Sequence, residues 1–131
     1  MKTLIVDDDF FSSQLLEEYL SQYGPCHRAD NGKDALEEMK EGFEWDQPYD
    51  LICLDIMMPK MDGQDALRQI RAFEESKGVS STKGVKVIMI TALNELASVK
   101  EAYLSLCDGY LVKPIKKESL LDELRKMKLI A

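Results

Sequence analysis

The sequence predicts an α/β fold in which five parallel strands form one sheet, with five helices distributed over its two faces. Short apolar segments alternate with segments whose apolar residues recur at helical spacing, an order typical of parallel sheets with helical crossovers. Most of the short segments are apolar at successive positions, as in strands buried on both faces. The chain has 131 residues, the length of one domain, and we expect residues 1–131 to form a single domain.

From the amino terminus, a strand at residues 3–6 leads into a first helix, which Gly24-Pro25 ends. Apolar residues at helical spacing mark this helix, namely Phe11, Leu15, Leu16, Tyr19 and Leu20. Residues 26–29 are a short candidate for the second strand, and Asp30-Asn31-Gly32 is a turn.

A second, short helix follows this turn, and we expect Gly42 to end it. Its apolar face consists of Ala35, Leu36 and Met39. Residues 43–49 then form a loop that contains the only tryptophan, Trp45. Residues 51–54 are apolar throughout and predict the third strand, which leads directly into Asp55.

The second half of the chain repeats the alternation. Asp62-Gly63 is a turn before a third helix, whose inner face consists of Ala66, Leu67, Ile70 and Phe73. Residues 76–84 are rich in Gly, Ser and Lys and predict an exposed loop before a strand at 85–90. The fourth helix carries Leu96, Val99, Ala102, Tyr103 and Leu106. A strand at 109–112 and a last helix follow, the helix marked by Leu120, Leu121, Leu124 and Met127.

Composition argues against several classes of protein. Seventeen basic and 24 acidic residues give a net charge of −7, which is unfavourable for nucleic-acid binding because phosphate contacts need clustered Lys and Arg. No apolar run approaches the roughly 20 residues of a membrane helix, and three aspartates interrupt the apolar start, unlike a signal peptide. Three separated cysteines without a CxxC pair indicate free thiols, so we expect a cytoplasmic protein. From the charge and the lack of a long apolar run, we expect it to contact neither nucleic acid nor membrane.

Polar residues follow four of the predicted strands. They are Asp7, Asp8 and Asp9 after the first strand, Asp55 after the third, Thr91 after the fourth and Lys113 after the fifth. The carboxyl ends of parallel strands meet at one edge of a sheet, where ligands bind. Carboxylates close together repel unless one is protonated or they share a cation, and Mg²⁺ prefers such oxygen ligands. A carboxylate can also attack phosphorus and form an aspartyl phosphate, whose oxygens an ammonium and a hydroxyl could bind.

Four segments together resemble the signature of response-regulator receiver domains of two-component systems, including the chemotaxis regulators. They are Val6-Asp7-Asp8, residues 54–63 (Leu-Asp-Ile-Met-Met-Pro-Lys-Met-Asp-Gly), Ile90-Thr91-Ala92 and residues 110–114 (Tyr-Leu-Val-Lys-Pro). The match covers essentially the whole chain in order. The resemblance implies a flavodoxin-like, doubly wound sheet with strand order 2-1-3-4-5.

The resemblance also implies the roles of the acidic residues. Asp55 would be the phosphoacceptor, and Asp7 and Asp8 would be the acidic pair that binds Mg²⁺ together with Asp55. The backbone carbonyl of Met57 would be a further metal ligand. Asp9 is expected to be solvated or to cap the first helix rather than to bind metal.

The resemblance further implies a phosphate-binding lysine and two switch residues. Lys113 would bind the phosphoryl group, Thr91 would be the switch hydroxyl and Tyr110 the switch aromatic. The Lys113-Pro114 bond is often cis in this family. A sensor histidine kinase or a phosphotransfer protein would supply the phosphoryl group, and a downstream effector would bind the face of helix 4, strand 5 and helix 5. The chain would thus be a switch and not a turnover enzyme.

The chain departs from the family pattern in two respects. The loops at 43–49 and 76–84 look longer than usual. Met57 and Leu93, each two residues beyond a site residue, are apolar at positions that flank the path of the hydrolytic water in this family. We hypothesise that these two side chains hinder the water and prolong the phosphorylated state.

Three other functions remain as alternatives. A haloacid-dehalogenase-type phosphatase also uses an aspartyl phosphate and Mg²⁺, but it would need a second acid where this chain has Met57. A flavodoxin-like flavin-binding module would need a Ser-, Thr- and Gly-rich loop where this chain has three aspartates, which would repel the flavin phosphate. The third is a receiver-like module that binds partners without being phosphorylated.

Overall fold

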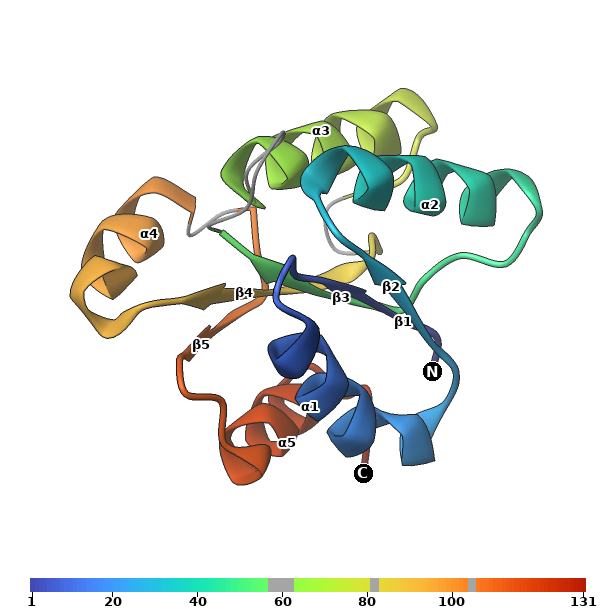
Figure 1. The fold of residues 1–131 in the computed structure, drawn as a ribbon. Coiled ribbons are helices and arrows are strands. Elements are labelled where there is room, and N and C mark those ends of the chain that lie inside the picture. Colours follow the sequence, from blue (N-terminus) through green and yellow to red (C-terminus); the bar gives the residue numbers. More distant parts are fainter. Residues whose placement is uncertain (57–62, 81–82, 104–105) are drawn as a thin grey trace.

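The structure, a computed structural model, describes residues 1–56, 63–80, 83–103 and 106–131. Its five strands are β1 (Thr3–Val6), β2 (Cys26–Ala29), β3 (Leu51–Asp55), β4 (Lys86–Thr91) and β5 (Gly109–Val112). They form one sheet in the order β2-β1-β3-β4-β5, and every neighbouring pair is parallel (Figure 1). This is the strand order that the resemblance implied, so the predicted α/β fold class is confirmed.

Helices cover both faces of this sheet (Figure 1). They are α1 (Phe10–Leu20), α2 (Gly32–Glu44), α3 (Gly63–Ser76), α4 (Leu96–Tyr103) and α5 (Lys117–Lys126). Short 3₁₀ segments occupy Ser21–Tyr23 and Leu93–Glu95. α1 and α5 pack on one face, and α2 and α3 pack on the other. None of the helices in the described ranges is long and apolar enough to cross a membrane.

The core has two layers because successive side chains of a strand point to opposite faces of the sheet. In β3, Leu51 and Cys53 face the layer that contains α1 and α5, whereas Ile52 and Leu54 face the layer that contains α2 and α3. All four side chains are fully buried. A strand covered on both sides needs an apolar residue at every position, which explains the uninterrupted apolar run in the sequence.

α2 is longer than the sequence suggested, because Gly42 lies inside the helix and not at its end. The helix continues to Glu44, and Trp45 caps it through a backbone hydrogen bond to the carbonyl of Glu41. A Cβ on Gly42 would come within 2.8 Å of the carbonyl oxygen of Gln47. The glycine therefore permits the following loop to fold back closely against the helix, a tertiary requirement that resembles a helix stop in the sequence.

Of the apolar residues that mark α1 in the sequence, Phe11 does not belong to the buried face, since its side chain is 80% exposed. The face that contacts the sheet is centred on Ser13, Leu16 and Leu20, which are buried. At 3.6 residues per turn, Phe11 lies about 140° around the helix from Leu16 and so points to solvent.

The fourth helix was also predicted too long at its carboxyl end. α4 ends at Tyr103, and Leu106, expected on this helix, lies beyond it in the turn before β5. There its side chain still packs, partly buried, against the core layer of α2 and α3.

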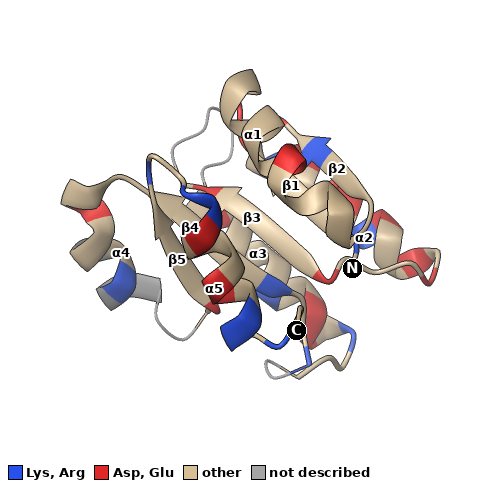
Figure 2. Ribbon diagram, turned by 90° about the horizontal axis from the view of Figure 1, so that it is seen from below, with Lys and Arg blue, Asp and Glu red and all other residues tan. Residues whose placement is uncertain are grey.

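Arg71 of α3 holds the segment before β5 and the start of β4 in place. Its guanidinium donates to the carbonyl of Leu106 at 2.8 Å, to the carbonyl of Val85 at 2.8 Å and to Asp108 at 3.1 Å. It also pairs with Glu74 at 2.8 Å, and both of these side chains are nearly buried. Glu74 in turn accepts a hydrogen bond from the backbone N–H of Val85 at 2.7 Å, so both of its carboxylate oxygens have hydrogen-bond donors. By contrast, α5 carries exposed i,i+3 ion pairs among its mixed charges (Figure 2).

We predict that Arg71→Met lowers the free energy of unfolding by about 3 kcal/mol, because it leaves the buried Glu74 carboxylate without its cation. The matched control is Arg125→Met, which removes a solvent-exposed ion pair with Asp122 and costs less than about 1 kcal/mol. Urea denaturation of both variants checks this. Equal effects of the two substitutions would contradict the structural role given to Arg71.

Candidate functional site

The carboxyl edge of the sheet brings together the polar residues that the sequence places after the strands. Asp7 and Asp8 follow β1, Asp55 ends β3, Thr91 ends β4, and Lys113 follows β5. The parallel registers of these strands align their ends at one edge. Of the predicted metal ligands, Met57 lies outside the described residues.

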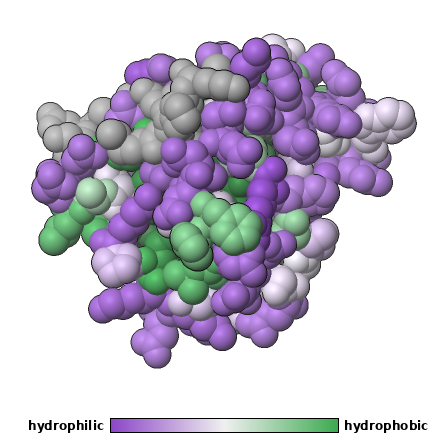
Figure 3. Space-filling model, viewed as in Figure 1, coloured by the Kyte–Doolittle hydropathy of each residue, from purple (hydrophilic) through white to green (hydrophobic). Residues whose placement is uncertain are grey.

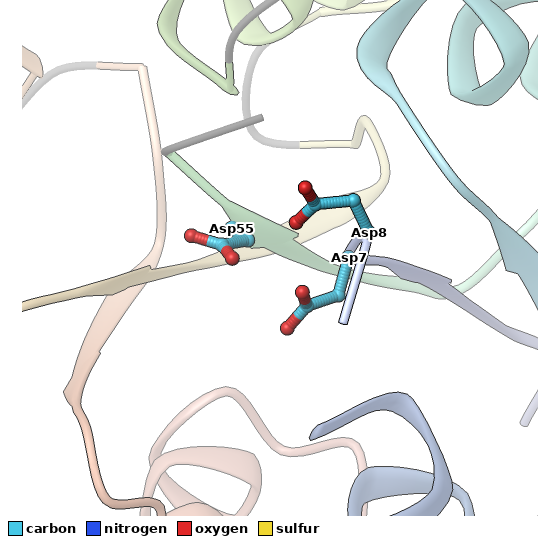
Figure 4. Close-up of side chains that lie close together, drawn as sticks. All are labelled: Asp7, Asp8 and Asp55. Atoms are coloured by element: carbon cyan, nitrogen blue, oxygen red, sulfur yellow. The ribbon is translucent and has the colours of Figure 1, made fainter. Parts of the chain in front are cut away.

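Three carboxyl groups converge at this edge (Figure 4). Asp7, Asp8 and Asp55 each offer one oxygen, and these oxygens lie within 4.8 Å of one another. Asp7 and Asp55 are each only 2% exposed, whereas Asp8 is exposed to solvent. Asp7 Oδ2 is buried without a hydrogen-bond partner, and a proton or a cation would satisfy such an atom. The carboxylate oxygens, including the unpartnered Asp7 Oδ2, fit Mg²⁺, which takes carboxylate ligands and keeps several waters.

The electrostatics of Asp7 agree with a site made for a cation. Burial and, to a smaller extent, the negative charge of the nearby Asp55 raise the pKa of this carboxyl group from 3.8 to about 6. The hydrogen bond from the backbone N–H of Asp9, 2.9 Å long, and the charge of Lys113 oppose this rise only in part. Without a cation, Asp7 therefore binds a proton far more readily than an ordinary aspartate.

Lys113 supplies the positive charge that the structure itself places in the site. Its Nζ donates to Asp55 Oδ2 at 2.9 Å, and the lysine side chain is 38% exposed against 3% for the aspartate. Burial lowers the pKa of Lys113, but the hydrogen bond and negative charge of Asp55 outweigh this, so the net shift is upward. The backbone N–H of Lys113 donates to the carbonyl of Thr91, and the Lys113-Pro114 bond is cis.

The two predicted switch residues lie on the strands next to this ion pair: Thr91 ends β4 opposite Val112, and Tyr110 lies on β5. Thr91 is buried, and its hydroxyl donates to the carbonyl of Ala92 at 3.3 Å. The Tyr110 hydroxyl is buried and its ring packs against the core, with Lys100 Nζ 5.8 Å from the ring centroid. Burial raises the pKa of Tyr110, and the phenol stays protonated at physiological pH.

Two further residues shape the site. Asp9 caps α1, since its carboxylate accepts from the N–H of Phe11 at 3.1 Å, which confirms the capping role expected from the sequence. Gly63, which the sequence marked only as part of a turn, lets α3 begin directly against β3. A Cβ at Gly63 would come within 2.4 Å of the carbonyl oxygen of Asp55. A glycine after an acidic turn is the only sequence signal for this contact.

Comparison with known proteins identifies the family of this site. Residues 3–125 match the family model of the response regulator receiver domain. The chemotaxis protein CheY of Halobacterium salinarum is 34% identical over 122 residues, covering 92% of this chain and 91% of that protein.

Solved structures agree. A chain in the co-crystal structure of the Saccharomyces cerevisiae histidine phosphotransfer signaling protein Ypd1 with the receiver domain of the response regulator Ssk1 superimposes with a TM-score of 0.82. It is 29% identical and covers 99% of this chain and 92% of its own length. The receiver domain of the Arabidopsis thaliana histidine kinase CKI1, complexed with Mg²⁺, gives a TM-score of 0.81 at 28% identity, over 96% of this chain and 90% of that one.

We predict that Asp7→Asn stabilises the metal-free protein at pH 7.5 by on the order of 1–3 kcal/mol. The folded-state pKa of Asp7, about 6, lies above its ordinary value of 3.8, so its contribution to stability is fully present below about pH 4 and is lost as the pH rises through 6. The asparagine removes this cost, and the advantage of the variant should shrink below pH 5.

Urea denaturation at several pH values, with and without Mg²⁺, measures this effect. Mg²⁺ should stabilise the wild type and act much more weakly on Asp7→Asn. Asp30→Asn, which removes an exposed carboxylate beyond β2, is the control and should change neither response. A destabilised Asp7→Asn at pH 7.5 without metal would show that the buried carboxylate is already compensated.

Proposed function

The chain belongs to the response regulator receiver domain family, and we propose that its residues 1–131 form one receiver domain whose Asp55 accepts a phosphoryl group in a Mg²⁺-dependent reaction. The donor would be a sensor histidine kinase or a phosphotransfer protein. The observation that carries this proposal is the pair of buried carboxyl groups, Asp7 and Asp55, beside an ammonium 2.9 Å from Asp55. Packing alone does not explain such a cluster.

In the proposed reaction a carboxylate oxygen of Asp55 attacks the phosphorus of a phosphohistidine. The P–O bond forms as the P–N bond breaks, and its electron pair stays on the departing imidazole nitrogen. Mg²⁺, when held by Asp7, Asp8, Asp55 and the expected carbonyl of Met57, neutralises charge on the phosphoryl oxygens. Lys113 orients the acceptor, because its ammonium already donates a hydrogen bond to one carboxylate oxygen of Asp55.

The product would reorganise the residues around Asp55. Phosphorylation adds up to two negative charges and three strong acceptors, so the Lys113 ammonium can follow the charge from the carboxylate to the phosphoryl group. The Thr91 hydroxyl, which donates to its neighbouring carbonyl at 3.3 Å, can exchange that contact for a phosphoryl oxygen. Tyr110 would respond to the position of Thr91, starting from a ring that is already partly buried.

These movements would bias the face formed by α4, β5 and α5 between two pre-existing states, and a downstream effector would bind one of them. The chain would act in the cytoplasm as a switch and not as a turnover enzyme, with neither nucleic acid nor membrane bound by this domain. The runner-up is a receiver-like module that binds its partner without phosphorylation.

The deciding experiment is the intact mass of the protein after incubation with acetyl phosphate and Mg²⁺. We predict a gain of one phosphoryl group in the wild type that is lost with chelator and lost in Asp55→Asn. Lys113→Ala should be phosphorylated much more weakly or fail to signal, because the ammonium no longer accompanies the acceptor. No gain in the wild type would favour the phosphorylation-independent module, and Mg²⁺ binding at Asp7 and Asp8 would then be measured directly.

The apolar side chains of Met57 and Leu93 predict a long-lived phosphoryl group. Leu93 is 73% exposed and stands two residues beyond Thr91, whereas Met57 lies outside the described residues. We expect Met57→Asn and Leu93→Asn to speed hydrolysis several-fold, a barrier change of less than about 1 kcal/mol, because a polar side chain can orient water. Decay of the phosphorylated mass after removal of the donor measures the rate, and faster loss in the wild type than in Met57→Asn would refute the hypothesis.

A further inference from the structure

The only tryptophan of the chain borders a hollow in the surface beside the carboxyl end of α2. Trp45 follows this helix directly, and its side chain is 73% exposed. The hollow has a volume of about 360 Å³, and Glu38, Glu41 and Tyr49 line it together with Trp45. Figure 3 shows that hydrophilic side chains surround the end of α2, where a few paler side chains project. The proposed function makes no use of this part of the surface.

The floor of this hollow already holds one cation against an aromatic ring. The Tyr49 side chain is buried, and the ammonium of Lys2 lies 4.2 Å from the centre of its ring. The same ammonium donates a hydrogen bond to the carbonyl of Gln47 at 2.7 Å. The face of an aromatic ring attracts a cation because its π electrons give it a negative potential. The pair of Lys2 and Tyr49 therefore indicates that this part of the surface favours positive charge.

Two carboxylates on α2 add negative charge to the hollow. Glu38 and Glu41 are three residues apart, so they lie on the same side of the helix. The hydroxyl of Tyr49 donates to Glu38 at 3.2 Å, and burial together with the negative charges of Glu38 and Glu41 raises the pKa of Tyr49. Glu41 is exposed, and within the described ranges its carboxylate has no ion pair. The hollow thus combines an exposed indole with an exposed carboxylate.

We propose that this hollow is the docking site for an arginine side chain of a partner protein, whose guanidinium stacks on the Trp45 indole and pairs with the Glu41 carboxylate. The inference goes beyond the proposed function and does not depend on it. An arginine fits better than a lysine because its planar guanidinium can stack on an aromatic face and bind a carboxylate at the same time. Tryptophan and arginine are also among the residue types that dominate the binding free energy of protein interfaces.

Charge decides which class of partner fits the hollow. The chain has a net charge of −7, so an anionic membrane surface, a nucleic acid and a second copy of this chain are all repelled. A purely apolar partner would remove water from the Glu41 carboxylate and leave it without a replacement donor. A basic segment of a partner protein satisfies the carboxylates and covers the indole in one contact.

The hollow lies at the edge of the sheet opposite the acidic cluster. Lys2 precedes β1 and Tyr49 lies just before β3, at the amino ends of these strands, whereas Asp55 is at the carboxyl end of β3 (Figure 1). A partner bound at Trp45 therefore leaves the proposed phosphoacceptor accessible. The chain can bind this partner and a phosphodonor at the same time.

The test measures the affinity of two peptides of equal charge, hexa-arginine and hexa-lysine with blocked ends, by isothermal titration calorimetry. Because Trp45 is the only tryptophan, its fluorescence reports directly whether the arginine peptide reaches it. The variants are Trp45→Ala, Trp45→Phe and Glu41→Gln. The matched controls are Phe11→Ala, which removes a similarly exposed ring on α1, and Glu118→Gln, which removes an exposed carboxylate on α5.

We expect hexa-arginine to bind the wild type about threefold to fivefold more tightly than hexa-lysine, the size of an exposed cation–π contact, and to change the fluorescence of Trp45. Trp45→Ala should remove this preference, and Trp45→Phe should keep part of it. Glu41→Gln should weaken the binding of both peptides by about threefold. Neither control should change the preference for arginine, and Glu118→Gln should weaken binding less than Glu41→Gln does.

The inference is wrong if hexa-arginine does not bind, if it binds no more tightly than hexa-lysine, or if its preference survives in Trp45→Ala. Equal effects of Glu41→Gln and Glu118→Gln would also overturn it, because binding would then follow net charge alone. A wild-type dimer in sedimentation velocity that Trp45→Ala dissociates would assign the hollow to a second copy of the chain and not to an arginine-bearing partner. None of these outcomes depends on phosphorylation of Asp55, since the readout is peptide affinity.

Discussion

The close approach of two buried carboxyl groups, Asp7 and Asp55, is the constraint on which the functional edge of this protein depends. Each would be costly to ionise alone in such a site, and together they repel. The chain compensates only part of that repulsion, through the Lys113 ammonium and the N–H of Asp9. The repulsion that is not compensated contributes to the raised pKa of Asp7, so additional positive charge at this edge would be favourable. A cation bound between these carboxyl groups would supply that charge.

The rest of the fold keeps these groups from moving apart. The strands that carry them are buried on both faces, which fixes their register and hence the positions of the residues at their ends. At Gly63 the backbone of α3 lies close to the carbonyl of Asp55, and farther along the same helix Arg71 donates a hydrogen bond to the carbonyl of Leu106, before β5. The same helix thus contacts both the end of β3 and the segment that leads into β5. Under the proposed function, this frame would let a new charge at Asp55 act on side chains and not on strand positions.

The sequence was sufficient for most of the sheet because strands buried on both sides leave an uninterrupted apolar run. The sequence was insufficient where the same residue type occurs in two different structural settings. Gly42 looked like a helix stop but allows a close loop contact, and Phe11 had the spacing of a core residue but points to solvent. The site residues were predictable from their places after strands, since a parallel sheet collects strand ends. The contact of Gly63 with Asp55 depends on tertiary packing, for which a glycine after an acidic turn is only an unspecific local signal.

The proposed acceptor site and the exposed aromatic pair, Phe10 and Phe11, lie on different parts of the same edge. The groups of the site are buried, charged and held by the sheet, and under the proposed function their arrangement would serve any activated phosphoryl group that can enter. The aromatic pair is exposed, uncharged and carried by the first turn of α1, where substitution leaves the sheet untouched. Asp9 links the two sets, because its backbone N–H donates to Asp7 and its carboxylate caps α1. Under the proposed function, a change in the first turn of α1 would therefore act on the acceptor site through this residue.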